Sequence, residues 1–204
     1  MNFPLSLRVK TQLVPAVPLI AEDSLASILN NSKIVTGGSG CANKGNRLFS
    51  DLNLANNTLE LSFYDYVTRL SDAAGFDRKN CSLAIPVTLP AGKKLVVSLI
   101  DIQGQVEASN PNTNATAKIT FEAFLAGTSQ KSQIKTIALK EGKRSFLYRK
   151  TNVLNSTCGG ESILRLNSNV LLTKTAASVA QVGPAELVQV KKISVYMNLE
   201  DCAL

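Results

Sequence analysis

The side chains that could do chemistry here are carboxylates, cysteines, lysines and arginines, because none of the 204 residues is histidine. This excludes Ser-His and Cys-His nucleophilic sites and any metal held by imidazole. An enzyme would have to use carboxylates, such as two acids about 5–10 Å apart across a glycosidic bond. The acids available for such a pair include Asp65, Asp77, Asp101, Glu107, Glu122 and Glu161. We interpret Asp101, which follows the mostly apolar run 95–100, as the polar end of a strand.

Four cysteines stand far apart in the chain. A zinc site needs close Cys/His pairs, so an even number at this spacing predicts two disulfides and neither a metal nor a cofactor. Disulfides persist in oxidising compartments, which predicts a secreted, extracellular or envelope protein. Of the three possible pairings we predict Cys41–Cys81 and Cys158–Cys202, in which each bridge encloses its own half of the strand series.

Positive charge dominates the surface chemistry, with 22 Lys and Arg against 15 Asp and Glu and a net charge of +7. This balance favours anionic partners such as acidic polysaccharide, with an attraction that falls as salt rises. Nucleic acid is not expected, because aromatic residues make up only 5% of the chain and Trp is absent. Seven cations fall within 131–150, which we expect to form a hairpin: Lys131, Lys135, Lys140, Lys143, Arg144, Arg149 and Lys150.

Two interpretations of this basic segment stay open. A run of charge is usually a solvated surface. The alternative is a ligand-binding site for an anionic polymer, with Lys143, Arg144, Arg149 and Lys150 as its candidate residues.

The elements that would position these residues have a period of two. Residues 58–64 alternate apolar and polar side chains, which is typical of a half-buried strand. The same pattern recurs at 83–89, 94–105, 115–125, 133–139, 145–150, 163–172 and 187–199, separated by turns rich in Gly, Pro and Asn. Eight or nine strands in series predict an all-β antiparallel sandwich or jelly roll.

One strand carries a second candidate site. Arg165, Asn167 and Asn169 alternate with apolar residues, so we expect them together on the outer surface of the sheet. A row of Asn and Arg on a flat sheet can hydrogen-bond a sugar, although a solvated surface is the alternative. Arg78 and Lys79 beside Cys81 suggest either an anion site or, as we prefer, an Arg78 that bonds carbonyls near the disulfide.

Residues 1–33 lack the alternation and are interpreted as an N-terminal leader or arm, with a single domain over 34–204. Arg8 and Lys10 precede a short apolar run, and Ser24-Leu25-Ala26 has the small-x-small form of a signal-peptidase site. A degenerate export signal and an ordered or flexible arm both stay open. No run of 18 apolar residues occurs, so no membrane-spanning helix is expected.

Several short motifs occur in a characteristic order. They are Gly-Ser-Gly-Cys at 38–41, Arg-Lys-Asn-Cys at 78–81, Leu-Pro-Ala-Gly at 89–92, Asp-Ile-Gln-Gly at 101–104, the segment 119–127, Cys-Gly at 158–159 and Cys202. From about Ile34 to Cys202 the chain resembles a secreted four-cysteine domain-of-unknown-function family, number 4360. The resemblance implies export, a four-cysteine framework and a β-rich domain, and supplies no catalytic residues.

Together these features predict a secreted or envelope-associated, non-catalytic binding protein that recognises an anionic polymer or a cell-surface glycan. The first alternative is a histidine-free carbohydrate-active enzyme with paired carboxylates. The second is a secreted effector or inhibitor of another protein.

Overall fold

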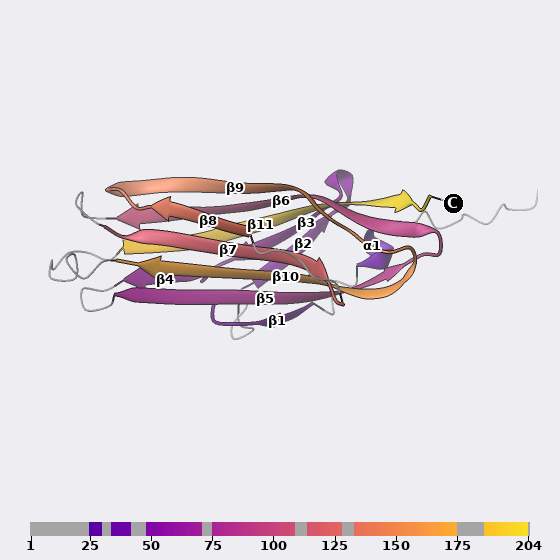
Figure 1. Ribbon diagram of the computed structural model, residues 1–204, viewed down its shortest axis with the longest axis horizontal. Helices are drawn as coiled ribbons and strands as arrows, with labels where there is room; N and C mark the ends of the chain where they lie inside the picture. The colour runs from indigo at the N-terminus through magenta and orange to yellow at the C-terminus, as the bar shows by residue number, and fades with distance from the viewer. Residues whose placement is uncertain are drawn as a thin grey trace, which may run out of the picture.

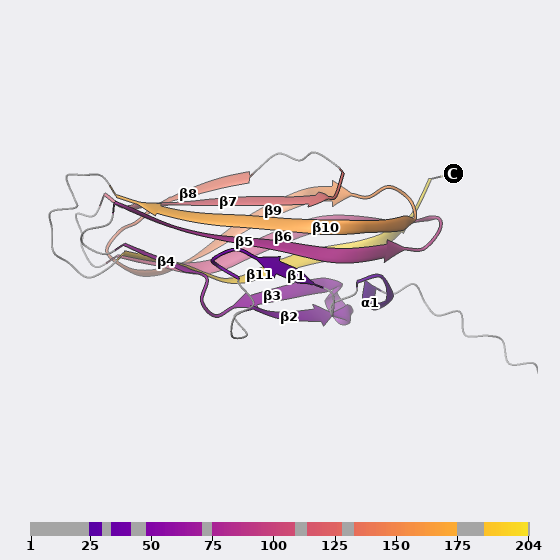
Figure 2. The same ribbon diagram turned by 90° about the horizontal axis from the view of Figure 1, so that it is seen from below.

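Two antiparallel β-sheets stack face to face in the computed structural model, which describes residues 25–29, 34–41, 48–70, 75–108, 114–127, 133–174 and 186–203. The strands run along the long axis of the molecule (Figure 1), and a quarter turn shows the two layers (Figure 2). The first sheet has the order β1 (Val35–Gly37), β5 (Phe76–Leu89), β10 (Gly160–Thr173), β7 (Thr116–Leu125) and β8 (Gln133–Ala138). The second has the order β2 (Leu48–Asn53), β3 (Thr58–Phe63), β11 (Glu186–Asp201), β6 (Lys93–Ala108) and β9 (Gly142–Asn155), with β4 (Val67–Leu70) beside β11.

The core lies between the sheets and is built by alternation. In β3 the side chains of Leu59, Leu61 and Phe63 are buried, and in β11 those of Val195 and Met197 are fully buried. The period of two in these segments therefore predicts their inward face correctly. The all-β antiparallel class is confirmed.

The expected strand number is wrong, because the described residues form eleven strands and not eight or nine. The additional strands are β1, β2 and β4, which are short. In β2 the pattern is also irregular, since Phe49 is exposed and Ser50 is half-buried, although Leu48 and Leu52 pack against the core. Such segments become strands because a neighbouring strand pairs with them, and that pairing leaves little signal in their own sequence.

The expected hairpin over 131–150 is also wrong. β8 pairs with β7 in the first sheet, whereas β9 pairs with β6 in the second, so the connection at 139–141 crosses from one sheet to the other. A lone two-stranded hairpin is marginally stable, while each of these strands extends a sheet that already has a buried face. Leu139, in the connection, is itself buried.

Both predicted disulfides are confirmed, Cys41 with Cys81 and Cys158 with Cys202. The first joins the turn after β1 to the middle of β5, and the second joins the turn before β10 to the end of β11. In the chain-entropy model, loops of this length make each bridge worth about 4 kcal/mol.

The N-terminal part of the described chain packs against the sandwich. A single helical turn, α1 (Leu25–Ile28), and the following Leu29 bury Leu25, Ile28 and Leu29 in the core, where Leu29 forms an isolated bridge with Val87. Residues 1–24 and 30–33 lie outside the described residues, so the proposed leader and its boundary stay predictions. None of the described helices is long and apolar enough to cross a bilayer.

Gly104 is the point of closest packing in the second sheet. It lies opposite Val190 on β11 and Phe146 on β9, and a Cβ at this position would overlap the carbonyl oxygen of Gln189 and the ring of Phe146. Any larger residue must therefore displace backbone atoms of the neighbouring strand.

Gly104→Ala is expected to lower the free energy of unfolding by about 1–3 kcal/mol, because this strand cannot move away from its two partners without strain. Gly75→Ala is the matched control, since a Cβ there meets nothing within 4 Å and its φ is not positive. Urea denaturation measures both. Equal stability of the two variants would contradict the packing described for Gly104.

Candidate functional site

A polar groove of about 240 Å³ lies on the outer face of the first sheet, across β5, β10 and β7. All of its side chains carry oxygen or nitrogen groups. The lining residues are Arg78, Asn80, Ser82, Thr120, Glu122, Asn167, Ser168 and Asn169.

Strand register aligns the groove residues in rows across the sheet. Asn169 on β10 lies opposite Asn80 on β5 and opposite Thr120 on β7. Directly opposed residues of antiparallel strands share one face and lie close enough for their side chains to interact. The next row, two residues along each strand, consists of Ser82, Asn167 and Glu122.

Hydrogen bonds between strands orient four of these side chains. Arg78 Nε donates to Asn169 Oδ1 at 2.9 Å, and Asn167 Nδ2 lies 3.5 Å from Glu122 Oε2. The bond at Nε restrains the Arg78 side chain beside β10. Its two terminal nitrogens donate to no group of the described residues, so they are available to a ligand.

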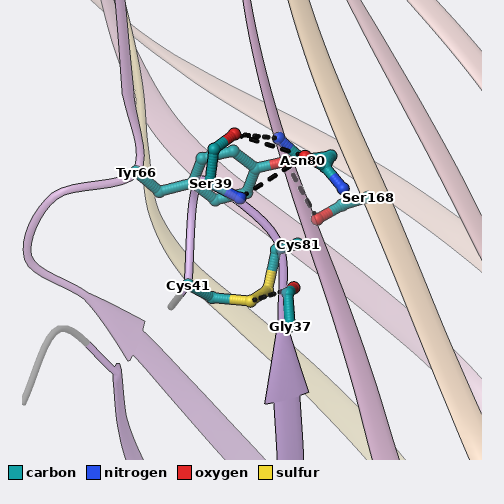
Figure 3. The surroundings of a disulfide bond; sticks show 7 residues. All are labelled: Gly37, Ser39, Cys41, Tyr66, Asn80, Cys81 and Ser168. Atoms are coloured by element: carbon teal, nitrogen blue, oxygen red, sulfur yellow. Dashed lines mark hydrogen bonds between the residues drawn. A yellow bond between two sulfur atoms is a disulfide. The ribbon is translucent and has the colours of Figure 1, made fainter. Parts of the chain in front are cut away.

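Asn80 is held by the turn that follows β1 (Figure 3). Ser39 Oγ donates to Asn80 Oδ1 at 3.2 Å, and the N–H of Gly40 donates to the carbonyl of Asn80 at 2.8 Å. The Cys41–Cys81 disulfide ties this turn to β5 one residue away. With its oxygen engaged, Asn80 presents amide N–H donors that bond no other group in the part of the chain described.

A buried tyrosine supports the groove from the inner side of the sheet. Tyr66 is fully buried and its hydroxyl donates to Ser168 Oγ at 3.1 Å. Burial raises the pKa of Tyr66, against smaller lowering effects of the Ser168 hydrogen bond and of Arg78, so the hydroxyl stays protonated. Its ring packs edge-on against Phe63 with centroids 5.5 Å apart, and Gly40 lies so close that a Cβ there would overlap the Tyr66 ring.

The residues of β10 that were predicted to lie on the outer face of the sheet do lie there. Asn167 and Asn169 line the groove, and Arg165 lies on the same face beside Ala84 and Phe124, beyond the groove itself. Arg78 differs from the preferred interpretation, because its Nε donates to the side chain of Asn169 and not to a carbonyl near the disulfide.

The candidate cations of the basic segment are dispersed. Lys143, Arg144, Arg149 and Lys150 all lie on β9 of the second sheet, and Lys131 lies outside the described residues. Lys143 and Arg149 point to one face of the strand and Arg144 and Lys150 to the other, because successive side chains alternate.

Arg149 is also engaged by a carboxylate. It binds Asp101 through two bonds, Nε to Oδ1 at 2.8 Å and Nη2 to Oδ2 at 2.7 Å. The hydrogen bond and the charge of Asp101 raise the pKa of Arg149. Asp101 is therefore a buried partner in the middle of β6, which corrects the expectation that it ends a strand.

Among the residues that the structure describes, acids do not gather in the groove. Glu122 is the one carboxylate among its described lining residues, and Asp77 accepts backbone N–H groups of Arg69 and Arg78 at 2.8 and 2.7 Å. Within the described ranges, no group of three or more acids or cysteines is arranged to hold a metal ion.

Sequence reasoning named Asn167 and Asn169 and weighed Arg78 as an anion site, but it did not identify Asn80, Ser82, Thr120 and Ser168 as site residues. Thr120 and Glu122 alternate with apolar residues along β7, which is the signal of an outward polar face. The start of β5 lacks this signal, because Arg78 is flanked by the charged residues Asp77 and Lys79. Finding the groove also requires the register between the strands, and the sequence of one strand does not contain that register.

Comparison with known families gives a match over most of the chain. The family described as "Domain of unknown function (DUF4360)" matches residues 29–202. The chain belongs to the DUF4360 family. The match begins slightly ahead of the range that the motifs suggested, and it confirms the resemblance seen in the sequence.

No curated protein matches this DUF4360 chain in sequence. Among solved structures, TmCBM61 in complex with β-1,4-galactotriose is 10% identical, with a TM-score of 0.25 over 83% of this chain and 89% of the other. A CBM4 structure is 9% identical, with a TM-score of 0.24 over 83% of this chain and 86% of the other. The enzymatically active domain of tailspike protein 4 from bacteriophage CBA120 is 10% identical, with a TM-score of 0.28 over 79% of this chain and 19% of the other. With TM-scores this low, the properties of these proteins are not carried over to the DUF4360 chain.

The Tyr66–Ser168 contact makes a testable prediction for the support of the groove. Tyr66→Phe leaves Ser168 Oγ without its buried donor, so the free energy of unfolding should fall by about 1–3 kcal/mol. A double-mutant cycle with Ser168→Ala should give a coupling energy of about 1 kcal/mol. Tyr64→Phe is the control, because Tyr64 is exposed and its loss of a hydroxyl should change little. A coupling energy near zero would contradict the contact.

Proposed function

We propose that this protein is a secreted or envelope-associated, non-catalytic glycan-binding protein, and that the polar groove on the first sheet is its binding site. The observation that carries the proposal is the row of Asn80, Asn169 and Thr120, with Asn167 in the next row. It aligns amides and hydroxyls from three strands on one open surface.

The chemistry of these groups suits sugar hydroxyls. A hydroxyl both donates and accepts, and a side-chain amide offers two N–H donors beside a carbonyl acceptor. Asn80 and Asn169 both have their oxygens engaged, by Ser39 and Arg78, which leaves their N–H groups directed to a ligand. A few fixed polar groups of this kind give a site its orientation and specificity.

The two disulfides support a location outside the reducing cytosol, since such bridges are rare where thiols are kept reduced. They also stiffen the binding surface. Cys41–Cys81 ties the turn that carries Ser39 to the strand that carries Asn80.

Hydrolysis at this groove is the less favoured alternative. Paired-carboxylate mechanisms need two acids about 5–10 Å apart, and Glu122 is the single acid among the lining residues that the structure describes. An effector or inhibitor of another protein is the other alternative, and it predicts no retention on any glycan.

An anionic-polymer site on β9 receives less support than the groove. Its four candidate cations divide between two faces of the strand, and Arg149 is engaged by Asp101. A polymer bound to one face of β9 would therefore contact only two of the four cations.

Asn167→Ala and Asn169→Ala together are expected to reduce affinity for the bound glycan about five- to a hundredfold, because each lost hydrogen bond is worth about 0.5–1.5 kcal/mol. The wild type would first be screened on an array of neutral and acidic glycans, and affinity then measured by titration calorimetry. Asn53→Ala is the matched control, an exposed Asn on β2 of the other sheet.

The melting temperature of the double variant should stay close to that of the wild type, since both side chains lie on the outer face. The proposal is wrong if the oxidised wild type is retained on no glycan. It is also wrong if binding survives Asn167→Ala/Asn169→Ala but is lost when Lys143 and Arg144 are replaced by Gln.

A further inference from the structure

An exposed aromatic ring stands at one end of the groove. Phe76 begins β5 with 68% of its surface exposed. It precedes Arg78 by two residues, so both project from the outer face, about 7 Å apart along the strand. Asn80 follows on the same face. An apolar ring left in water beside a line of polar groups is the arrangement in which an aromatic side chain can pack against the apolar face of a ligand.

The same end of the groove is positively charged. Leu171 on β10 lies opposite Arg78 on β5 and opposite Lys118 on β7, so two cations flank it at about 10 Å from each other. Lys118 is exposed. Glu122, the groove's acid, lies four residues further along β7, about 14 Å away. The Phe76 end of the groove therefore carries two cations, whereas Glu122 near the other end is accompanied by Arg165 on the same face.

The position of Arg78 suits the binding of an anion at this end of the groove. Its Nε bond to Asn169 Oδ1 holds the guanidinium beside the groove, while the terminal nitrogens donate to no atom of the described ranges. A guanidinium held in this way can bind both oxygens of one anionic group, which an ammonium on a flexible stem cannot do as well.

We infer that the ligand is an acidic glycan that places a carboxylate or sulfate group on Arg78. The ring of that sugar packs against Phe76, and neighbouring hydroxyls bind Asn80, Asn169 and Asn167. The inference rests on the proposed function and adds the class of sugar and its direction along β5.

Matched pairs of polysaccharides test the inference and separate the two anions. The first pair is oligogalacturonate and its methyl ester, which differ in the charge of the carboxyl group. The second is dextran sulfate and dextran, which differ in sulfate. At physiological ionic strength the wild type should bind the charged member of at least one pair ten times more tightly than the neutral member.

Arg78→Gln should reduce this preference to about threefold or less, and Arg78→Lys should restore only part of it, because the charge returns without the paired donors. Phe76→Ala should weaken binding of the charged member severalfold. Lys191→Gln is the control, an exposed cation on β11 of the second sheet whose loss should leave the preference unchanged. Melting temperatures confirm that each variant is folded.

The inference is wrong if Arg78→Gln keeps the tenfold preference, if Lys191→Gln removes it equally, or if Phe76→Ala binds like the wild type. A wild type that binds a neutral glycan through Asn167 and Asn169 without preferring charge would refute the inference and leave the proposed function standing. A wild type that binds no glycan on the array or in either pair would refute both.

Discussion

The pairing of β5 with β10 is the constraint on which the rest of the structure depends. The two strands run antiparallel from Phe76 opposite Thr173 to Leu89 opposite Gly160. Because side chains alternate, one register sends Cys81 and its apolar neighbours to the core and Asn80 to the groove. A slip of one residue would exchange the two faces of the strand, so core and groove are specified together.

The sequence was sufficient to predict features that depend on a single segment of the chain. The alternation of Asn167 and Asn169 with apolar residues predicted their outward position, because period two needs no knowledge of the neighbouring strand. The disulfide pairing was predicted by a similar local argument, since Cys41–Cys81 and Cys158–Cys202 join successive cysteines. The class of fold followed from the repeated pattern.

Features that depend on partners were missed. Arg78 and Asn80 belong to a strand predicted to start at residue 83, because the polar stretch before it becomes a strand only by pairing with β10. The short turn at 141–143 predicts a hairpin for the basic segment, yet the apolar residue Leu139 is buried where the chain crosses between sheets. Arg149 was counted as a free cation because Asp101 is distant in sequence.

The central claim, that the outer face of the first sheet binds a glycan, is tested most directly by nuclear magnetic resonance. The isotope-labelled protein would be titrated with the tightest-binding oligosaccharide while backbone and Asn side-chain amide signals are followed. The account predicts that shifts concentrate at residues 76–82, 118–122 and 167–171, with the Nδ2 signals of Asn80 and Asn169 among the largest. Shifts concentrated on β9, with these signals unmoved, would contradict it.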